Sequence, residues 1–181
     1  MKLDRSKTKN SIRSIALVAM LLAILIIQEE FLIFIPNVQL TVILIIVYAQ
    51  FLDDKELYPL VIAYVIIDSM IMGGLSFMYT PSMMLSWSLL AFVSKKVKNS
   101  PDYVKLIIAV LFGFVYGWSF LPATAILQKF SRLEQFFTYI KFDLIFEVTM
   151  SISGLVTYLV FYNPLMHLFR QLYNQTEKLE Y

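Results

Sequence analysis

Long apolar runs separated by short polar breaks dominate this sequence of 181 residues. Hydrophobic residues make up 59% of the chain and charged residues only 15%, whereas typical soluble domains contain about 25% charged residues. The mean hydropathy is +0.72. A soluble core of this size cannot bury so much apolar surface, so we expect a lipid bilayer to cover part of it.

A membrane-spanning helix needs about 20 mostly apolar residues. Six candidate segments occur, at Ser14–Ile35, Val38–Leu52, Leu57–Met72, Ser82–Val93, Leu106–Leu121 and Ile140–Tyr162. We therefore predict an all-α fold, an integral membrane bundle of six transmembrane helices. The membrane domain covers residues 14–169, between a basic N-terminus (1–13) and a polar tail (170–181). The second and fourth segments are short, so they either extend into flanking polar residues or sit inside the bundle. Four spans are the alternative count.

The polar breaks carry helix start and stop signals. In Ser100-Pro101 the serine is expected to cap the next helix and the proline to occupy its first position. Residues 122–139 are expected to form the longest polar connection, in which Ser131-x-x-Glu134 resembles a capping box for a short helix. Asn163-Pro164 is expected to end or kink the last helix.

The distribution of lysine and arginine predicts the orientation, because these residues concentrate in cytoplasmic loops. With six spans and both termini in the cytoplasm, twelve of the 15 basic residues lie on the inner side. The other three, on the outer side, are Lys129, Arg132 and Lys141.

The apolar run that begins near Ile15 is longer than the roughly 7–15 residues of a signal-peptide core, so we expect it to be retained as the first helix. These observations predict a multi-pass protein of the cell membrane, in a bacterium.

Residue types needed for several classes of chemistry are missing. The chain has no cysteine and one histidine, His167, which excludes thiolate and multi-histidine metal sites as well as cysteine nucleophiles. It has no glycine-rich phosphate loop, metalloprotease motif or nucleophile elbow. The net charge of +2 is too small to indicate nucleic acid as a partner. We therefore expect a protein that is not an enzyme and holds no cofactor or metal.

Acidic residues within or beside the apolar segments are candidates for a site, since an ionisable group in a membrane span is costly and by default functional. They are Glu29, Glu30, Asp68, Asp143 and Glu147. Glu29, Glu30 and Asp143 lie near the segment ends, where hydration by the interface is the alternative. Asp68 and Glu147 lie deeper, so they need a partner or a water-filled cavity.

Polar and aromatic residues gather near the predicted outer side, where they could form a ligand pocket. They are Asn37, Gln39, Thr41, Tyr79, Thr80, Trp87, Tyr116, Trp118 and Gln128. An interfacial aromatic belt is the alternative, most evenly balanced for Trp118.

Small residues recur along the first segment at Ala16, Ala19 and Ala23. Ala19 and Ala23 are four residues apart and share a helix face, which would let another helix approach closely. Spacing alone favours packing inside the bundle over docking of a partner.

Three segments together resemble a known family. Ser14–Ala23 is an alanine-spaced first helix, Pro36–Thr41 stands at the position of a first external loop, and Phe142–Leu165 begins with Asp-Leu-Ile and ends with Pro-Leu. In these features, and in length and number of spans, nearly the whole chain resembles the substrate-binding S component of an energy-coupling factor (ECF) vitamin transporter.

The resemblance implies a six-helix bundle that captures a vitamin or related micronutrient from outside. It also implies partners, namely a transmembrane coupling subunit and two cytoplasmic ATPase subunits that drive uptake. The alanine face of the first helix, with Ala16, Ala19 and Ala23, would dock on the coupling subunit. By position, the resemblance assigns the substrate-binding pocket to Asn37, Gln39, Tyr79, Trp87, Trp118 and Glu147. Motifs diagnostic of thiamine or biotin binders are missing, and cobalamin carriers are the most similar members.

Two other classes of function stay open. A structural or assembly protein of the membrane would need no pocket, and its polar residues would be paired internally. A proton-coupled carrier would use Asp68 and Glu147 and would work without partner subunits.

Overall fold

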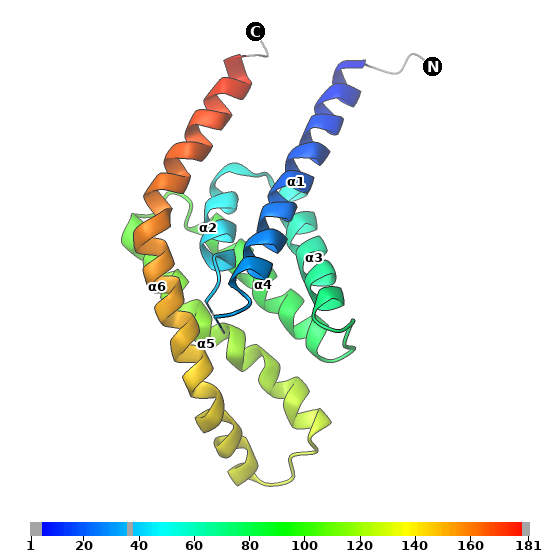
Figure 1. The fold of residues 1–181 in the computed structure, drawn as a ribbon, viewed down its shortest axis with the longest axis vertical. Helices are drawn as coiled ribbons and strands as arrows, with labels where there is room; N and C mark the ends of the chain where they lie inside the picture. Colours follow the sequence, from blue (N-terminus) through cyan, green and yellow to red (C-terminus); the bar gives the residue numbers. More distant parts are fainter. Residues whose placement is uncertain (1–4, 36–37, 179–181) are drawn as a thin grey trace.

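The computed structural model describes residues 5–35 and 38–178, with side chains for 12–35 and 38–172. The described residues form six α-helices and no strand (Figure 1). The helices are α1 (Arg5–Leu32), α2 (Thr41–Phe51), α3 (Asp54–Ile71), α4 (Tyr79–Lys96), α5 (Asp102–Leu127) and α6 (Leu133–Lys178). The predicted all-α fold with six helices is confirmed.

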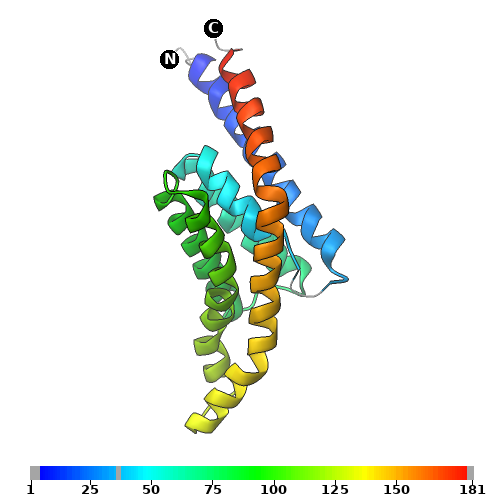
Figure 2. The same cartoon turned by 90° about the vertical axis from the view of Figure 1, so that its left-hand side faces the viewer.

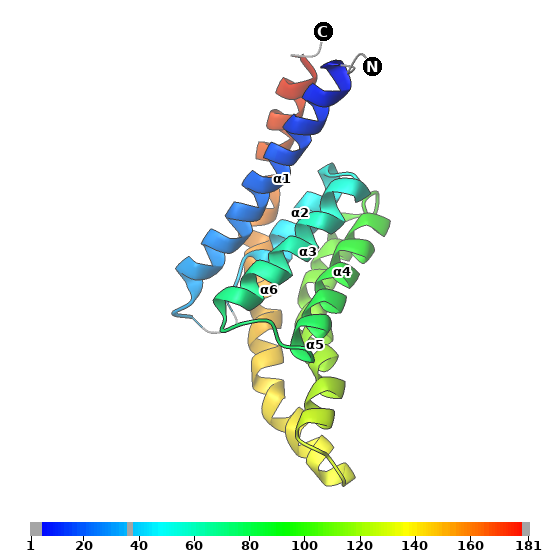
Figure 3. The ribbon, with the colours of Figure 1, turned by 90° about the vertical axis from the view of Figure 1, so that its right-hand side faces the viewer.

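The chain reverses direction at each connection, so the helices form an up-and-down bundle (Figures 1 and 3). The start of α1 and the end of α6 lie at one end of the molecule, which we call the terminal end. The connections α2–α3 and α4–α5 lie toward the terminal end as well. The α5–α6 connection forms the opposite tip, the hairpin end, where the two helices extend beyond the other four (Figure 2).

Helix α2 is the centre of the bundle. Ten of its 11 residues are buried, and it contacts α1, α4, α5 and α6. Its sequence from Thr41 to Phe51 is apolar nearly all round, as expected for a helix with neighbours on every side. At about 17 Å it is too short to cross a bilayer core of about 30 Å. The short second segment therefore sits inside the bundle, one of the two arrangements that its length allows.

Within the described residues, three helices are long and apolar enough to cross a membrane. These stretches are Ile12–Leu32 in α1, Asp102–Leu127 in α5 and Leu133–Leu172 in α6. Each carries large apolar side chains that no other part of the described chain covers, such as Ile15, Leu111 and Leu159. An apolar outer surface on long helices is typical of a protein whose solvent is lipid.

Glycines let α5 and α6 pack closely along most of α5. A Cβ atom at Gly113 would lie 2.7 Å from the backbone oxygen of Glu147 and from the backbone nitrogen of Ser151. A Cβ atom at Gly154 would lie 3.1 Å from the carbonyl carbon of Ala109. Gly113 and Gly117 have the GxxxG spacing that permits such contact between membrane helices. The notable small-residue motif for internal packing is therefore in α5.

Hydrogen bonds fasten the ends of α2. The Gln28 side chain donates to Thr41 Oγ1 at 2.7 Å and accepts from the Leu40 backbone at 2.8 Å, so α1 holds the start of α2. At the other end, Lys95 donates to the Leu52 carbonyl at 2.6 Å and pairs with Asp54 at 3.1 Å. The polar turn after α2 is thus tied to the end of α4.

Several predicted helix boundaries are wrong. Residues 122–139 do not form a long connection, because α5 continues through Pro122 to Leu127 and α6 begins at Leu133. Ser131-x-x-Glu134 therefore spans the start of α6 itself, and the side chain of Gln135, rather than Glu134, accepts from the Ser131 backbone at 2.8 Å. A proline is tolerated inside a helix that neighbouring helices support.

Two further predicted signals do not set the helix boundaries. Pro101 occupies the N-cap position of α5 with extended backbone, and the first helical residue is Asp102, so Ser100 is not the cap. Asn163-Pro164 does not end α6, which runs on to Lys178, so the predicted polar tail is largely helical. The capping box that the structure does contain joins Asp53 and Glu56 at the start of α3.

The α5–α6 contact yields a stability prediction. Gly154→Leu should lower the free energy of unfolding by about 1–3 kcal/mol, because its side chain overlaps the backbone at Ala109. Val156→Leu, which adds one carbon at an exposed position of the same helix, should change stability by less than about 0.5 kcal/mol. Thermal unfolding of both variants in detergent, followed by tryptophan fluorescence, measures the difference. Equal melting temperatures would show that the helices are not in close contact there.

Candidate functional site

Two adjoining cavities lie in the half of the bundle toward the hairpin end. The first, the α5–α6 cavity, has a volume of about 370 Å³. It is lined by Gly113, Tyr116, Gly117, Phe120, Tyr139, Asp143, Phe146, Glu147 and Met150. The second, the loop cavity, has a volume of about 220 Å³. It is lined by Glu29, Leu32, Ile33, Ile35, Val38, Gln39, Met72, Tyr116 and Met150. Tyr116 and Met150 line both cavities, which makes them neighbours.

Glu147 is the most unusual residue of the α5–α6 cavity. It is only 2% exposed, yet neither carboxylate oxygen has a hydrogen-bond partner among the described residues. The indole of Trp118 interacts with this carboxylate, but without a hydrogen bond of normal geometry. Gly117 leaves the space that the carboxylate occupies, since a Cβ atom there would lie 2.7 Å from Oε1 of Glu147. A buried charge without such a bond is expensive, so this carboxylate is available for a ligand.

The charged residues that line the two cavities are all acidic. Asp143 and Glu147 are four residues apart on α6 and face the same cavity, and Glu29 lines the loop cavity. No lysine, arginine or histidine is among the lining residues. Glu29 accepts a hydrogen bond of 2.6 Å from the hydroxyl of Tyr64, so one of the three acids has a defined partner.

A chain of aromatic rings from three helices backs the cavities. Tyr64 of α3 meets Trp87 of α4 edge-on, with ring centroids 5.7 Å apart. Trp87 in turn lies 5.3 Å from Tyr116 of α5, and Tyr116 lies 5.0 Å from Phe120. The last ring, Tyr79, is 5.9 Å from Phe120. These contacts hold Tyr116 and Phe120 in place as the wall of the α5–α6 cavity.

The structure brings together only part of the predicted pocket. Glu147 and Gln39 line the cavities, and the Gln39 backbone donates to Ser153 Oγ at 3.3 Å. Trp87 and Tyr79 line neither cavity and support the wall from behind. Trp118 is 54% exposed on the outer side of α5, touching the site only through Glu147.

Asn37, the remaining predicted pocket residue, lies outside the described residues.

Several lining residues are not among the six that the resemblance assigned to the pocket. The sequence offered Glu29, Asp143 and Tyr116 only as wider candidates, and it did not single out Phe120 or Tyr139. A signal for two pairs was present, since Tyr116 with Phe120 and Asp143 with Glu147 each have the four-residue spacing of one helix face. Which helix those faces meet could not be read from the spacing.

Asp68 is buried in α3 but lines neither cavity. The two deep acids of the sequence, Asp68 and Glu147, are therefore not brought into one cavity.

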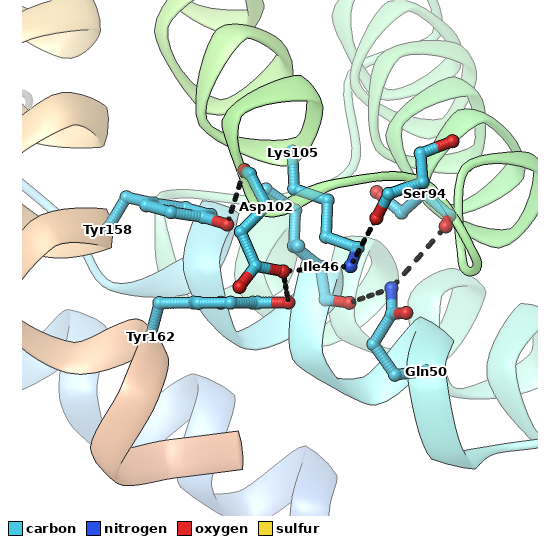
Figure 4. A network of polar contacts seen from close by, with 8 residues as sticks. Ile46, Gln50, Ser94, Asp102, Lys105, Tyr158 and Tyr162 are labelled. Atoms are coloured by element: carbon cyan, nitrogen blue, oxygen red, sulfur yellow. Dashed lines mark hydrogen bonds and ion pairs between the residues drawn. The ribbon is translucent and has the colours of Figure 1, made fainter.

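A third cavity, of about 490 Å³, lies at the terminal end beside the contact between α5 and α6. Several of its polar groups bond to one another (Figure 4). Buried Lys105 donates to Asp102 at 3.2 Å and to the Ser100 carbonyl at 3.1 Å. Tyr162 also donates to Asp102, at 3.1 Å, and Tyr158 donates to the Asp102 carbonyl at 2.8 Å. This network fastens the start of α5 to α6.

The alanines of α1 face outward. Ala16, Ala19 and Ala23 are all exposed, while Leu21 and Leu25 on the opposite face are buried against the bundle. Internal packing, which spacing alone favoured, is therefore not the role of these alanines in the described chain. They form a smooth strip on a helix whose other exposed residues, such as Met20 and Ile24, are bulky.

Among the described residues, no group of three or more histidine, cysteine, aspartate or glutamate side chains is placed to hold a metal ion. Comparison with the models of known protein families finds no match, and neither the curated proteins nor the solved structures include a similar chain.

The Tyr64–Glu29 bond can be tested by removing one oxygen atom. Tyr64→Phe should lower the free energy of unfolding by about 1–3 kcal/mol, because Glu29 loses a hydrogen bond in a half-buried position. Tyr103→Phe, at an exposed position of α5, is the matched control and should have no effect. Chemical unfolding in mild detergent compares the two. An unchanged free energy of unfolding in Tyr64→Phe would mean that this hydrogen bond does not form in the folded protein.

Proposed function

We propose that this chain is a non-catalytic membrane subunit that captures a small molecule, corresponding to the S component of an ECF-type vitamin transporter. The observation that carries the proposal is the pair of adjoining cavities with the carboxylate of Glu147, which forms no ion pair and no hydrogen bond of normal geometry among the described residues. A structural protein of the membrane would pair its buried polar groups internally, as the network around Lys105 does at the other end. An acid left without a partner inside a cavity favours a binding site instead.

The position of the cavities relative to the basic residues supports capture from outside. The connections near the terminal end carry Lys55, Lys95, Lys96 and Lys98, whereas the cavities lie toward the hairpin end. If the basic terminal end faces the cytoplasm, the cavities belong to the outer half of the bundle. Six crossings with both termini inside would produce this arrangement, with α2 covered by its neighbours rather than by lipid.

The outward strip of Ala16, Ala19 and Ala23 supports a partner subunit. Small side chains let a second helix approach the backbone closely, and no helix of the described chain uses this strip. A coupling subunit that contacts two cytoplasmic ATPases is the partner that the proposal requires. The chain itself carries no nucleotide-binding motif that could supply the energy for uptake.

The cavity volume bears on the ligand. The α5–α6 cavity, at about 370 Å³, lies at the small end of the range of about 300–1,000 Å³ for small-molecule sites. Cobalamin, the nearest ligand by resemblance, is far larger than a typical drug-sized molecule. The cavities therefore favour a vitamin or micronutrient of smaller size.

The competing proposal is a proton-coupled carrier, which would work without partner subunits, whereas an S component needs them. Such a carrier would use Asp68 and Glu147, but Asp68 lines neither cavity.

The orientation can be tested with single cysteines, since the chain has none of its own. Ser131→Cys at the hairpin end should react with a membrane-impermeant maleimide on intact cells. Asn99→Cys at the terminal end should react only after the cells are permeabilised. Both positions are exposed, so each should react when accessible. The reverse pattern would overturn the orientation, and labelling of both positions from one side would overturn the six-span topology.

Partner docking can be tested by enlarging the alanines. Ala19→Trp combined with Ala23→Trp should reduce co-purification with ECF coupling subunits at least about tenfold, equivalent to about 1.4 kcal/mol. Leu159→Trp, on the exposed face of α6, should leave co-purification unchanged.

Failure of the unmodified protein to associate with any ECF coupling subunit would contradict the proposal, as would full association of the double variant. Uptake that persists without partner subunits and is lost in Asp68→Asn would favour the proton-coupled carrier.

A further inference from the structure

The charges of the α5–α6 cavity select the kind of molecule that fits it. On the basis of the proposed function, we infer that the cavity binds a small ligand with a positively charged nitrogen, which pairs with the carboxylate of Glu147. Four features of the cavity favour such a ligand: the lack of a cationic partner for that carboxylate, the sign of the surrounding charges, the aromatic wall, and the glycine that makes room.

The carboxylate of Glu147 lacks a cationic partner within the described chain. The basic residues nearest to the cavity along α5 and α6 are Lys129, Arg132 and Lys141, and all three are exposed. None of them lines the cavity or forms an ion pair with Glu147 in the part of the chain that the structure describes. A cation supplied by a ligand would remove the cost of leaving this group unpaired.

The other charges of the site have the same sign. Asp143 lies one helical turn from Glu147 in the same wall, and Glu29 lies in the adjoining loop cavity. Three acids without a lining base give the site a negative potential, which attracts cations and repels anions. A ligand that depends on a free carboxylate for recognition would meet repulsion here.

The aromatic wall suits a flat or cationic group. Tyr116, Phe120, Tyr139 and Phe146 line the α5–α6 cavity together with Met150. The faces of such rings attract ammonium groups and stack on planar rings. The cavity thus combines a carboxylate with π faces, a pairing that recognises amines, amidines and ring nitrogens that carry a proton.

Gly117 makes this arrangement possible. The Glu147 side chain lies against the bare backbone of α5, where a Cβ atom would come within 2.7 Å of both Cγ and Oε1. Any larger residue at 117 would move the carboxylate. The glycine therefore positions Glu147, and its replacement should disturb ligand binding without removing a charge.

Three probes of matched shape test the charge preference. Tryptamine, tryptophol and indole-3-acetate share an indole ring and carry a positive, a neutral and a negative group. Calorimetry with the purified full-length protein in nanodiscs should show that tryptamine binds at least about tenfold more tightly than either of the others. Equal or tighter binding of indole-3-acetate or tryptophol would overturn the inference, and so would the lack of detectable binding by tryptamine.

Variants locate the preference at Glu147. Glu147→Gln keeps the shape but removes the charge, and should weaken tryptamine binding at least about tenfold. Gly117→Ala should weaken it as well. Glu134→Gln, at an exposed position near the start of α6, removes the same charge outside the cavity and should leave binding unchanged. Retained tryptamine affinity in a folded Glu147→Gln protein, as judged by its melting temperature, would show that the carboxylate is not the partner.

A second measurement does not depend on the choice of probe. Mass spectrometry of small molecules that co-purify with the protein should find one that is cationic at neutral pH and is missing from the Glu147→Gln preparation. A retained anionic molecule would contradict the inference.

These experiments use the subunit alone, so they separate the ligand from the transporter. Preferential amine binding without association to a coupling subunit would leave the ligand inference standing and overturn the proposed function. Association with a coupling subunit together with preferential binding of the anionic probe would do the opposite.

Discussion

The close approach of α5 and α6 is the contact on which the rest of this molecule depends. Gly113 and Gly154 let the two backbones meet, and Gly117 accepts the side chain of Glu147 against the bare backbone. In a lipid environment such contact is a main source of helix association, because the apolar effect between helices is largely absent. The same packing that joins the helices therefore also places a carboxylate at the wall of a cavity.

The two ends of the α5–α6 pair differ in whether a buried charged group has bonded partners. At the terminal end, Lys105 and Asp102 form an ion pair, and the hydroxyl groups of Tyr158 and Tyr162 donate to Asp102 (Figure 4). Toward the hairpin end, Glu147 has no hydrogen-bond partner of this kind in the part of the chain that the structure describes. The first arrangement stabilises the fold. The second leaves a buried carboxylate to which a group of a ligand could bind. This contrast is the main support for a binding role.

Helix α2 shows how a helix too short to cross a membrane can belong to this six-helix bundle. Its ends are held by Gln28 and Lys95, and its sides are covered by four other helices. A short helix in that position needs neither full span length nor contact with lipid. It leaves α1 free to present its alanine strip outward, which is what docking on a coupling subunit would require.

Apolar runs and polar breaks are local properties of the chain, and the sequence alone determined that this protein is all-helical with six helices and largely apolar. It also placed Glu147 and Gln39 among the candidate pocket residues. The helix ends predicted at Pro122 and Pro164 are wrong, because a proline ends a helix only when nothing else supports the backbone around it. The tertiary structure alone decided that α2 is central and that the alanines of α1 face outward. It also decided that Tyr116 joins Glu147 in the cavity wall while Trp118 lies mostly outside. The physical reason is that helical spacing specifies which residues share a face, whereas the partner of that face depends on packing between segments far apart in the sequence.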